Sequence, residues 1–268
     1  MKIIALTSCC VDVFPDLGQV YVGGNSLNVA TQCKLSGVDD VSVIGGIGSD
    51  AHGTLVKNHL DSWNINSHHL YRLPEPTASN QIYLDDKGDR FFKEDSWQGG
   101  AFDAFRLSKK DWELIEGADI VAMPAGDPSL SDLLRKRQQQ LVVVDFLDYL
   151  PLEFMASHLE QIDIAFISAK EEMLGELQTL SSESGTMVIA TLGENGSVAF
   201  HENQRIIQGA IPAEAVIDTT GCGDAFQAAF FIEWYNSKEL PRSLFTGATA
   251  AKEVLGYHGG VQPFPTTK

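Results

Sequence analysis

The 268-residue sequence predicts an α/β fold in which helices cover both faces of a mostly parallel sheet. Two observations lead to this prediction. Apolar, β-branched runs of strand length alternate with segments that carry apolar residues at helical spacing. After residue 222 the pattern becomes purely helical. No linker, repeat or low-complexity tract interrupts it, so we expect a single domain over residues 1–268.

The predicted strands are short runs rich in Val and Ile. They cover Ile3–Ser8, Val41–Gly45, Ile120–Met123, Leu141–Asp145, Ile164–Ser168, Met187–Leu192 and Gly196–His201. The predicted helices cover Asn25–Ser36, Thr54–Trp63, Ser108–Ile115, Lys170–Leu180, Gly223–Asn236 and Leu240–Leu255. Strands that alternate with helices normally run parallel, because each helix returns the chain to the starting edge of the sheet.

One segment departs from this alternation. Two strand-like runs, Thr77–Leu84 and Asp89–Lys93, flank the acidic turn Asp85-Asp86-Lys87-Gly88, which is typical of a β-hairpin. A hairpin over about residues 77–93, inserted into an α/β domain, would serve as a lid over a pocket. The alternative is an edge hairpin with no part in binding.

The formal net charge of −17 argues against binding of a nucleic-acid backbone, which requires clustered Lys and Arg. Most acidic side chains are expected to serve solubility, although acidity also favours a cationic substrate. No apolar run reaches the length of a membrane span, and the N-terminal run resembles a strand more than a signal peptide. The cysteines lack zinc-site spacing. We therefore expect a cytoplasmic protein with reduced thiols and no membrane partner.

The most informative segment connects a strand-like end to a long apolar helix, through Val216-Ile217-Asp218-Thr219-Thr220-Gly221-Cys222-Gly223-Asp224-Ala225-Phe226. The two glycines of its Gly-x-Gly turn allow several backbone N–H groups to point into one concavity. The helix N-terminus adds about half a positive charge there. Such an anion hole suits a transferring phosphoryl group, and Asp224 beside it is a candidate base. The alternative for Asp224 is a helix cap.

Two more Gly-containing segments are candidate binding loops. Gly23-Gly24-Asn25-Ser26-Leu27-Asn28-Val29-Ala30 opens a helix whose amides can bind sugar hydroxyls, and Asp12 follows the first strand into the same crevice. Thr191-Leu192-Gly193-Glu194-Asn195-Gly196-Ser197 follows a strand and can approach a nucleotide closely. Taken alone, a capped loop explains the first segment and a β-turn explains the second.

These three segments, in this order, resemble the ribokinase-like (PfkB) family of carbohydrate kinases. Gly23–Ala30 resembles the first family signature, and Asp218–Asp224 resembles the second, Asp-Thr-x-Gly-Ala-Gly-Asp. The resemblance covers essentially the whole chain and implies a ribokinase-like three-layer α/β/α fold with a small β-hairpin lid. Within the family the chain looks most similar to bacterial fructoselysine 6-kinases, on Thr191–Ser197, Asp89-Arg90, Asp145-Phe146 and Tyr257-His258-Gly259-Gly260.

The resemblance implies a role for each matching residue. Asp224 would be the base, and the N–H groups of Gly221, Cys222 and Gly223 would form the anion hole. Those that hold the sugar are Asp12, Gly24 and Asn28. Those that line the ATP site are Thr191, Gly193 and Gly196.

Ions and a partner subunit are implied in the same way. Glu171 matches the acidic end of the family's Asn-x-x-Glu motif, which organises Mg²⁺ and phosphate through water. Asp218 and Thr220 fall where some relatives bind a monovalent cation such as K⁺. In many relatives the lids meet across a homodimer.

Two positions depart from the family pattern. Ser168 stands where the family usually has the Asn of Asn-x-x-Glu, which affects the positioning of the metal. Cys222 replaces the usual Ala. Because a helix N-terminus lowers the pKa of a thiol, Cys222 is either a reactive thiol or an incidental small residue.

The resulting expectation is in-line transfer of the ATP γ-phosphoryl group to a sugar hydroxyl, first of all the 6-hydroxyl of a fructosamine such as fructoselysine. Arg90 suits the carboxylate of such a substrate and acidic groups suit its amine, although Arg90 is equally explained as an ordinary hairpin charge. The alternatives are a kinase for another ketose or a nucleoside, and a non-catalytic sugar or nucleotide sensor. No Gly-x-Gly-x-x-Gly follows the first strand, which disfavours a dinucleotide-dependent oxidoreductase. His68-His69 is expected to be a solvated pair and not a metal site.

Overall fold

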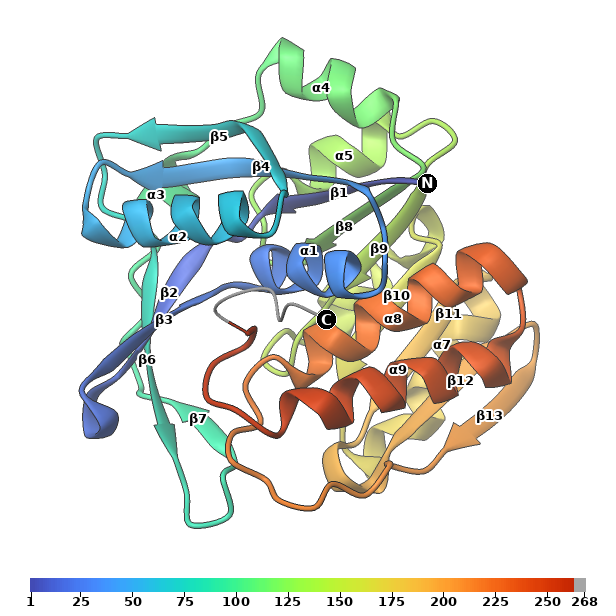
Figure 1. Ribbon diagram of the computed structural model, residues 1–268. Coiled ribbons are helices and arrows are strands. Elements are labelled where there is room, and N and C mark those ends of the chain that lie inside the picture. The colour runs from blue at the N-terminus through green and yellow to red at the C-terminus, as the bar shows by residue number, and fades with distance from the viewer. Residues whose placement is uncertain (263–268) are drawn as a thin grey trace.

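A nine-stranded sheet is the centre of the computed structural model, which describes residues 1–262 (Figure 1). Neighbouring strands are parallel except at β11–β12 and β12–β13. Across the sheet the strands are β13 (Gln204–Gln208), β12 (Ser197–His201), β11 (Met187–Thr191), β10 (Ile164–Ser168), β9 (Leu141–Asp145), β8 (Ile120–Pro124), β1 (Lys2–Thr7), β4 (Asp40–Gly48) and β5 (Asn66–Leu73). The mostly parallel sheet predicted from the sequence is confirmed.

Helices cover both faces of this sheet, and each face has its own apolar core. On one face lie α1 (Asn25–Leu35), α2 (Ala51–Ser62), α8 (Cys222–Ser237) and α9 (Leu240–Val254). On the other lie α4 (Lys109–Glu116), α5 (Leu130–Lys136), α6 (Leu152–Ala156) and α7 (Leu174–Ser184). The central strands β8, β9 and β10 are buried on both sides and are almost continuous apolar runs, whereas β5 and β13 at the edges are partly exposed. The three-layer α/β/α fold is confirmed.

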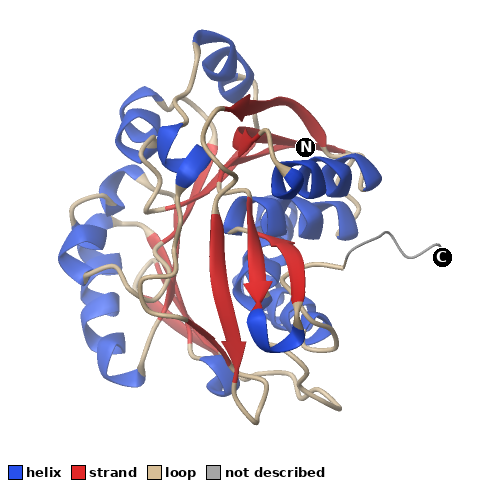
Figure 2. Cartoon of the chain, turned by 90° about the vertical axis from the view of Figure 1, so that its left-hand side faces the viewer, coloured by secondary structure: helices blue, strands red, loops and turns tan. Residues whose placement is uncertain are grey.

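A second, four-stranded sheet stands beside the first, in the order β3 (Gln19–Gly23), β2 (Cys10–Phe14), β6 (Ser79–Leu84) and β7 (Arg90–Phe92). Figure 2 looks at the molecule from the side of this small sheet. The predicted hairpin is its antiparallel β6–β7 pair. Short α3 (Gly100–Ala104) follows it and inserts Phe102 against Cys10 and Ala78, at the base of the small sheet.

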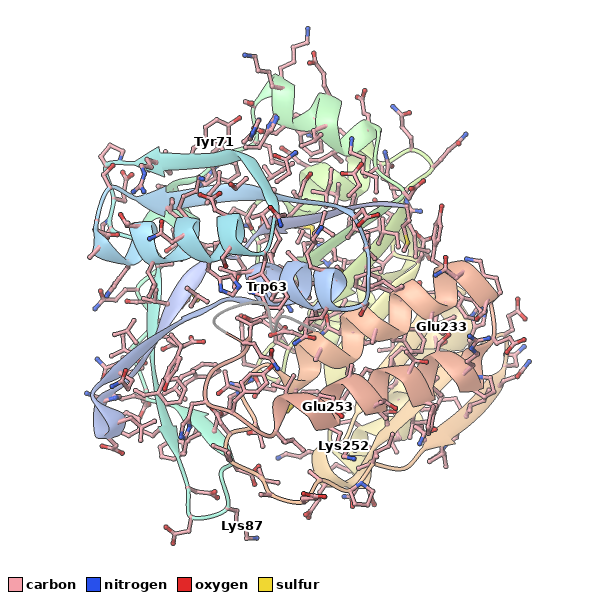
Figure 3. The ribbon with its side chains drawn as sticks, in the orientation of Figure 1. Trp63, Tyr71, Lys87, Glu233, Lys252 and Glu253 are labelled. Atoms are coloured by element: carbon pink, nitrogen blue, oxygen red, sulfur yellow. The ribbon has the colours of Figure 1, made fainter. Side chains whose placement is uncertain are left out.

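The tip of the β6–β7 hairpin rests on the loop that precedes α8. The N–H of Thr219 donates to the Gly88 carbonyl (3.1 Å), and the N–H of Arg90 donates to the Thr219 hydroxyl (3.0 Å). Lys87 extends from the tip away from the rest of the molecule (Figure 3). The small sheet therefore meets the Gly-x-Gly segment directly, as a lid over it would.

Several sequence expectations need correction. The predicted hairpin is part of a four-stranded sheet, because β2 and β3 extend it. The expected strand end at Val216-Ile217 is an exposed loop. The expected helix over Lys170–Leu180 starts as a 3₁₀ turn at Glu171–Met173, and α7 continues to Ser184. Within residues 1–262, no helix has both the length and the apolarity to cross a membrane.

Candidate active site

The candidate site lies along the carboxyl edge of the main sheet, where open α/β sheets generally bind ligands. The parallel strands β1, β8, β9, β10 and β11 end there, at Thr7, Pro124, Asp145, Ser168 and Thr191. The N-terminus of α8 reaches the same edge, because Gln227 Nε2 donates to Asp145 Oδ2 at 2.7 Å. The Gly-x-Gly segment and the strand ends are thus brought together.

One position of the Gly-x-Gly segment requires glycine. Gly221 precedes α8 with φ +79°, and a Cβ there would overlap the backbone of Gly260. A Cβ on Gly223 would meet no heavy atom within 4 Å, so this residue borders open space. The Cys222 N–H donates to the Thr219 carbonyl (3.3 Å), whereas the N–H groups of Gly221 and Gly223 donate to no acceptor in the described chain. These two free donors suit an anion.

Asp224 does not cap its helix. Its carboxylate faces α1 and accepts Asn25 Nδ2 on Oδ1 and Asn28 Nδ2 on Oδ2, each at 2.7 Å. Burial raises the pKa of Asp224 to about 7, and the charge of Asp145 raises it too, while the Asn28 bond, the Arg90 charge and the Asn25 bond lower it. A carboxylate with a pKa near the working pH has the property required of a general base.

The predicted sugar-binding residues converge on this carboxylate. Asn28 is buried, and its Oδ1 has no hydrogen-bond partner among residues 1–262, so one acceptor is left for a hydroxyl. Gly24 has φ +96° and packs against Ser8, which lets α1 begin close to β1. Asp12 is buried on β2, and burial raises its pKa to about 7.

Arg90 approaches these acids from the hairpin. Its guanidinium lies 4.5 Å from the centre of the Phe92 ring, and its positive charge lowers the pKa of Asp12, Asp145 and Asp224. Arg90 lies on β7 of the predicted hairpin, from where its charge acts on all three carboxyl groups. Its role in substrate binding stays a prediction.

The predicted nucleotide residues lie farther along the same edge. Thr191 ends β11 beside Ser168 at the end of β10. Gly193 starts the exposed turn Gly193–Asn195, and Gly196 packs against the Gln208 carbonyl with φ +89°. A hollow of about 370 Å³ between this turn and the start of α7 is lined by Ala169, Lys170, Glu171, Glu172, Leu192 and Asn195. Glu171 is thereby brought to the expected nucleotide loop.

Asp218 and Thr220 join the Gly-x-Gly segment to the loop after α9. Asp218 is fully buried, and its oxygens accept the N–H groups of Thr220 (2.7 Å) and Gly259 (2.8 Å). His258 Nδ1 lies 4.0 Å from the same carboxylate. The Thr220 hydroxyl is buried without a hydrogen-bond partner in the described part of the chain.

Two further expectations from the sequence concern Cys222 and the His68-His69 pair. Burial raises the pKa of the Cys222 thiol to about 12, which favours an incidental small residue over a reactive thiol. His69 is not a solvated member of a pair, because its Nδ1 lies 2.6 Å from the buried Asp111 carboxylate, while His68 is exposed. No group of three or more metal-ligating side chains occurs among residues 1–262.

Sequence reasoning missed three side chains of the site. Asn25 was noted only for sugar hydroxyls and Asp145 only as part of a family-like string, and Gln227 was not noticed. All three meet around Asp224, through Asn25 Nδ2 to Asp145 Oδ2 (2.9 Å) and the Gln227 bond. The available signals were a charged residue at the end of a buried strand and polar residues on otherwise apolar α8.

The chain is similar to known proteins over nearly its whole length. The model of the pfkB family of carbohydrate kinases matches residues 17–267. The chain is 32% identical over 254 residues to the fructoselysine 6-kinase of Escherichia coli (strain K12), covering 93% of this chain and 95% of that protein. It is 28% identical over 265 residues to the fructosamine kinase FrlD of Bacillus subtilis (strain 168), covering 97% and 92%.

A solved structure has the same fold. The ribokinase of Arabidopsis thaliana, complexed with ribose and ATP, superposes with a TM-score of 0.82 at 24% identity, over 98% of this chain and 95% of that one. Because the family model matches nearly the whole sequence and the relatives align over nearly their full lengths, this chain belongs to the pfkB family of carbohydrate kinases.

Proposed function

We propose that this kinase acts in the cytoplasm, where ATP is available, and transfers the γ-phosphoryl group of ATP to the 6-hydroxyl of a fructosamine such as fructoselysine. The observation that carries the proposal is the position of Asp224. It stands one residue after an anion hole with two free N–H donors, and its pKa is raised to about 7. A base and an anion hole side by side are what phosphoryl transfer to a hydroxyl needs.

The chain's own groups would act as follows. Asp224 accepts the proton of the attacking hydroxyl, with its carboxylate held by the amides of Asn25 and Asn28. The N–H groups of Gly221 and Gly223 donate to the oxygens of the transferring group, and the Cys222 N–H can join them by giving up its long bond to Thr219. Binding of the nucleotide is assigned to Thr191, Gly193 and Gly196.

Mg²⁺ fits the residues present. It prefers oxygen ligands and, in nucleotide sites, is held mainly by phosphates and water, so few protein ligands are needed. This agrees with the lack of a three-ligand cluster within residues 1–262. Glu171 lines the hollow beside the Gly193–Asn195 turn and would hold the ion through water. When bound, Mg²⁺ neutralises phosphate charge.

A monovalent cation fits less well. Each oxygen of Asp218 already accepts a backbone N–H group, and His258 lies beside the carboxylate. The hydroxyl of Thr220 is a further oxygen of this segment, buried and without a hydrogen-bond partner within residues 1–262. We therefore write the reaction without K⁺, and initial rates in K⁺ against those in choline salts test this.

Charge supports an amine-bearing sugar. Asp12, Asp145 and Asp224 share the influence of one positive charge, that of Arg90, so a substrate ammonium would offset the excess negative charge. Arg90 would pair with the carboxylate of the amino-acid part. Relatives named fructoselysine 6-kinase and fructosamine kinase support the same choice. A ribokinase of Arabidopsis thaliana is also 28% identical, so a plain sugar is the alternative that the test must include.

The test is ATP consumption with Mg²⁺ over fructoselysine, a fructosamine without the carboxylate, free ketoses and nucleosides, with Asp224→Asn as the blank. We expect fructoselysine to give the highest kcat/KM. Arg90→Gln should lower kcat/KM for fructoselysine about tenfold more than for the carboxylate-free fructosamine, because any effect on the pKa of Asp224 is common to both substrates. A preference for a ketose or nucleoside would reject the substrate, and binding without turnover of any of them would reject the kinase reaction in favour of a sensor.

We further infer a homodimer that meets through the small sheets, as the family resemblance implies. Phe91, Phe92 and Trp97 are large apolar side chains that remain 52%, 43% and 45% exposed on and after the hairpin. Exposed aromatic groups on a sheet favour association. Sedimentation equilibrium should give twice the monomer mass, and Phe91→Lys should restore the monomer.

A further inference from the structure

A chain of three hydrogen bonds runs from Asp224 through Asn25 and Asp145 to Gln227, and the backbone of α8 closes it into a ring. Asn25 Nδ2 has two hydrogens, and it donates to Asp224 Oδ1 at 2.7 Å and to Asp145 Oδ2 at 2.9 Å. Gln227 Nε2 donates to the same Asp145 oxygen at 2.7 Å. Gln227 follows Asp224 by three residues on α8, so one turn of that helix closes the ring.

The ring leaves the amide of Asn25 only one orientation. If the amide were turned over, its oxygen would face two carboxylate oxygens, which no donor would relieve. Asp145 is itself fixed from the other side, because its Oδ1 accepts the N–H of Leu147 at 2.9 Å. Leu147 adopts φ +60°, a left-handed conformation that is costly for a residue with a Cβ. The chain accepts that cost at the residue that holds Asp145.

Burying the carboxylate of Asp145 also costs stability, which the charge of Arg90 offsets only in part. Burial raises the pKa of Asp145 to about 6, and Asp148 raises it further. An amide or an apolar residue would avoid this cost. Asp145 has no contact with the anion-hole N–H groups, and its oxygens are taken by Asn25, Gln227 and Leu147. Its contacts therefore lead to the base and not to the phosphoryl group.

We propose that Asp145 and Asn25 are positioning residues for phosphoryl transfer, in which Asp145 fixes the amide of Asn25 and Asn25 fixes the carboxylate of Asp224 toward the attacking hydroxyl. This inference rests on the proposed role of Asp224 as the base. In this role Asp145 acts through Asn25 and not through contact with the substrate. Asn28 binds the other oxygen of Asp224. With that bond alone the carboxylate could rotate about it, and the bond from Asn25 prevents this rotation.

The ionisable groups around Asp224 determine what the variants should do. They are Asp145 at the end of β9, Arg90 on β7, Cys10 on β2 and Cys222 on α8 itself. The charge of Asp145 raises the pKa of Asp224 by more than the Asn25 bond lowers it. Removing the charge of Asp145 and removing the donor of Asn25 should therefore move the titration of Asp224 in opposite directions.

The experiment is a pH profile of kcat and kcat/KM for the wild type, Asn25→Ala and Asp145→Asn. We expect kcat on the alkaline plateau to fall about 10- to 100-fold in both, since one bond to a charged group is lost or misdirected, while KM for ATP stays within about twofold. The acidic limb of kcat/KM should move up by about one pH unit in Asn25→Ala and down in Asp145→Asn.

Thr31→Val is the matched control, because Thr31 is buried on the same helix and its hydroxyl donates to the Leu27 carbonyl (2.9 Å) and contacts His59, away from the carboxylates. It should lower the melting temperature and leave the pH profile in place. If Asn25→Ala and Asp145→Asn behave like this control, with unchanged kcat and an unmoved acidic limb, the proposal is wrong.

Two further variants keep the outcome unambiguous. Should Asp145→Asn fail to fold, Gln227→Met loosens the same carboxylate from α8 and should lower kcat about two- to tenfold with KM for ATP unchanged. An unchanged kcat there refutes the role of Asp145. Asp224→Asn separates the two levels of inference, because a high residual activity of that variant rejects the base itself, whatever Asn25 and Asp145 do.

Discussion

Replacing Asp224 by Asn tests both the chemistry and the burial of the candidate base. Loss of a general base typically lowers the rate by about 10²–10⁴, which corresponds to roughly 3–5 kcal/mol of barrier. The side chain keeps its size, and one of its two amide contacts survives, since Asn still offers an oxygen to Asn25 or Asn28. The fold should therefore remain intact while turnover is lost.

The same substitution should stabilise the protein at alkaline pH. Asp224 has its pKa raised from 3.8 to about 7, so the unfolded chain ionises before the folded one, and the stability that this group contributes falls between those pH values and stays low above them. The interval corresponds to roughly 4 kcal/mol, which residual solvent contact reduces. A lost hydrogen bond to a charged group offsets about 1.5–3 kcal/mol of it.

The assay combines coupled ATP consumption with urea unfolding at pH 5 and pH 8. We expect Asp224→Asn to lose most activity, and its stability relative to the wild type to rise by about 2–3 kcal/mol from pH 5 to pH 8, because the hydrogen-bond loss is the same at both pH values. Asp132→Asn, on the exposed Asp132–Arg135 pair of α5, should change neither quantity measurably. Retention of more than about a tenth of the activity would reject the base. An equal stability difference at both pH values would reject the raised pKa.

Three more predictions concern the same region. The wild-type kcat/KM should rise with pH through about 7 as Asp224 ionises, and a profile flat from pH 5 to 9 would contradict this. Gly221→Ala should cost about 2 kcal/mol or more in urea unfolding, because of its φ of +79° and the overlap with Gly260, whereas Gly175→Ala, in an open position of α7, should be neutral or stabilising. Cys222→Ala should keep kcat within about threefold, and the wild-type thiol, with its pKa raised to about 12, should resist iodoacetamide at pH 8 until the protein is unfolded, as mass spectrometry would show.

Much of the fold could be predicted from the sequence, because buried parallel strands are uniform apolar runs. β9 and β10 have the predicted bounds, and α8 and α9 differ from them by a residue at each end or less. Of the strands that were missed, β3, β5 and β13 lie at sheet edges and are partly exposed, and polar residues interrupt their pattern. β2 is buried inside the small sheet, but it has only five residues and carries Asp12. Their pairing comes from tertiary contacts and not from local sequence.

The site was predictable only where one segment contains both the backbone geometry and the reactive group, as in Gly221–Asp224. The ring around Asp224 was not, because it joins α1, β9 and α8 over sequence separations of 120 and 199 residues. The raised pKa of the Cys222 thiol was also hidden, because it depends on burial by segments far along the chain. Topology, and not spacing, brings these groups together.

Two glycine-dependent contacts near the start of α8 have a consequence for evolution. A Cβ on Gly221 would overlap Gly260, and a Cβ on Gly260 would overlap the side chain of Asn28. Gly221, Gly260 and Asn28 thus pack so closely that a side chain added at either glycine would overlap its neighbour, and none of the three positions can change alone. The reactive centre should therefore be inherited as a block.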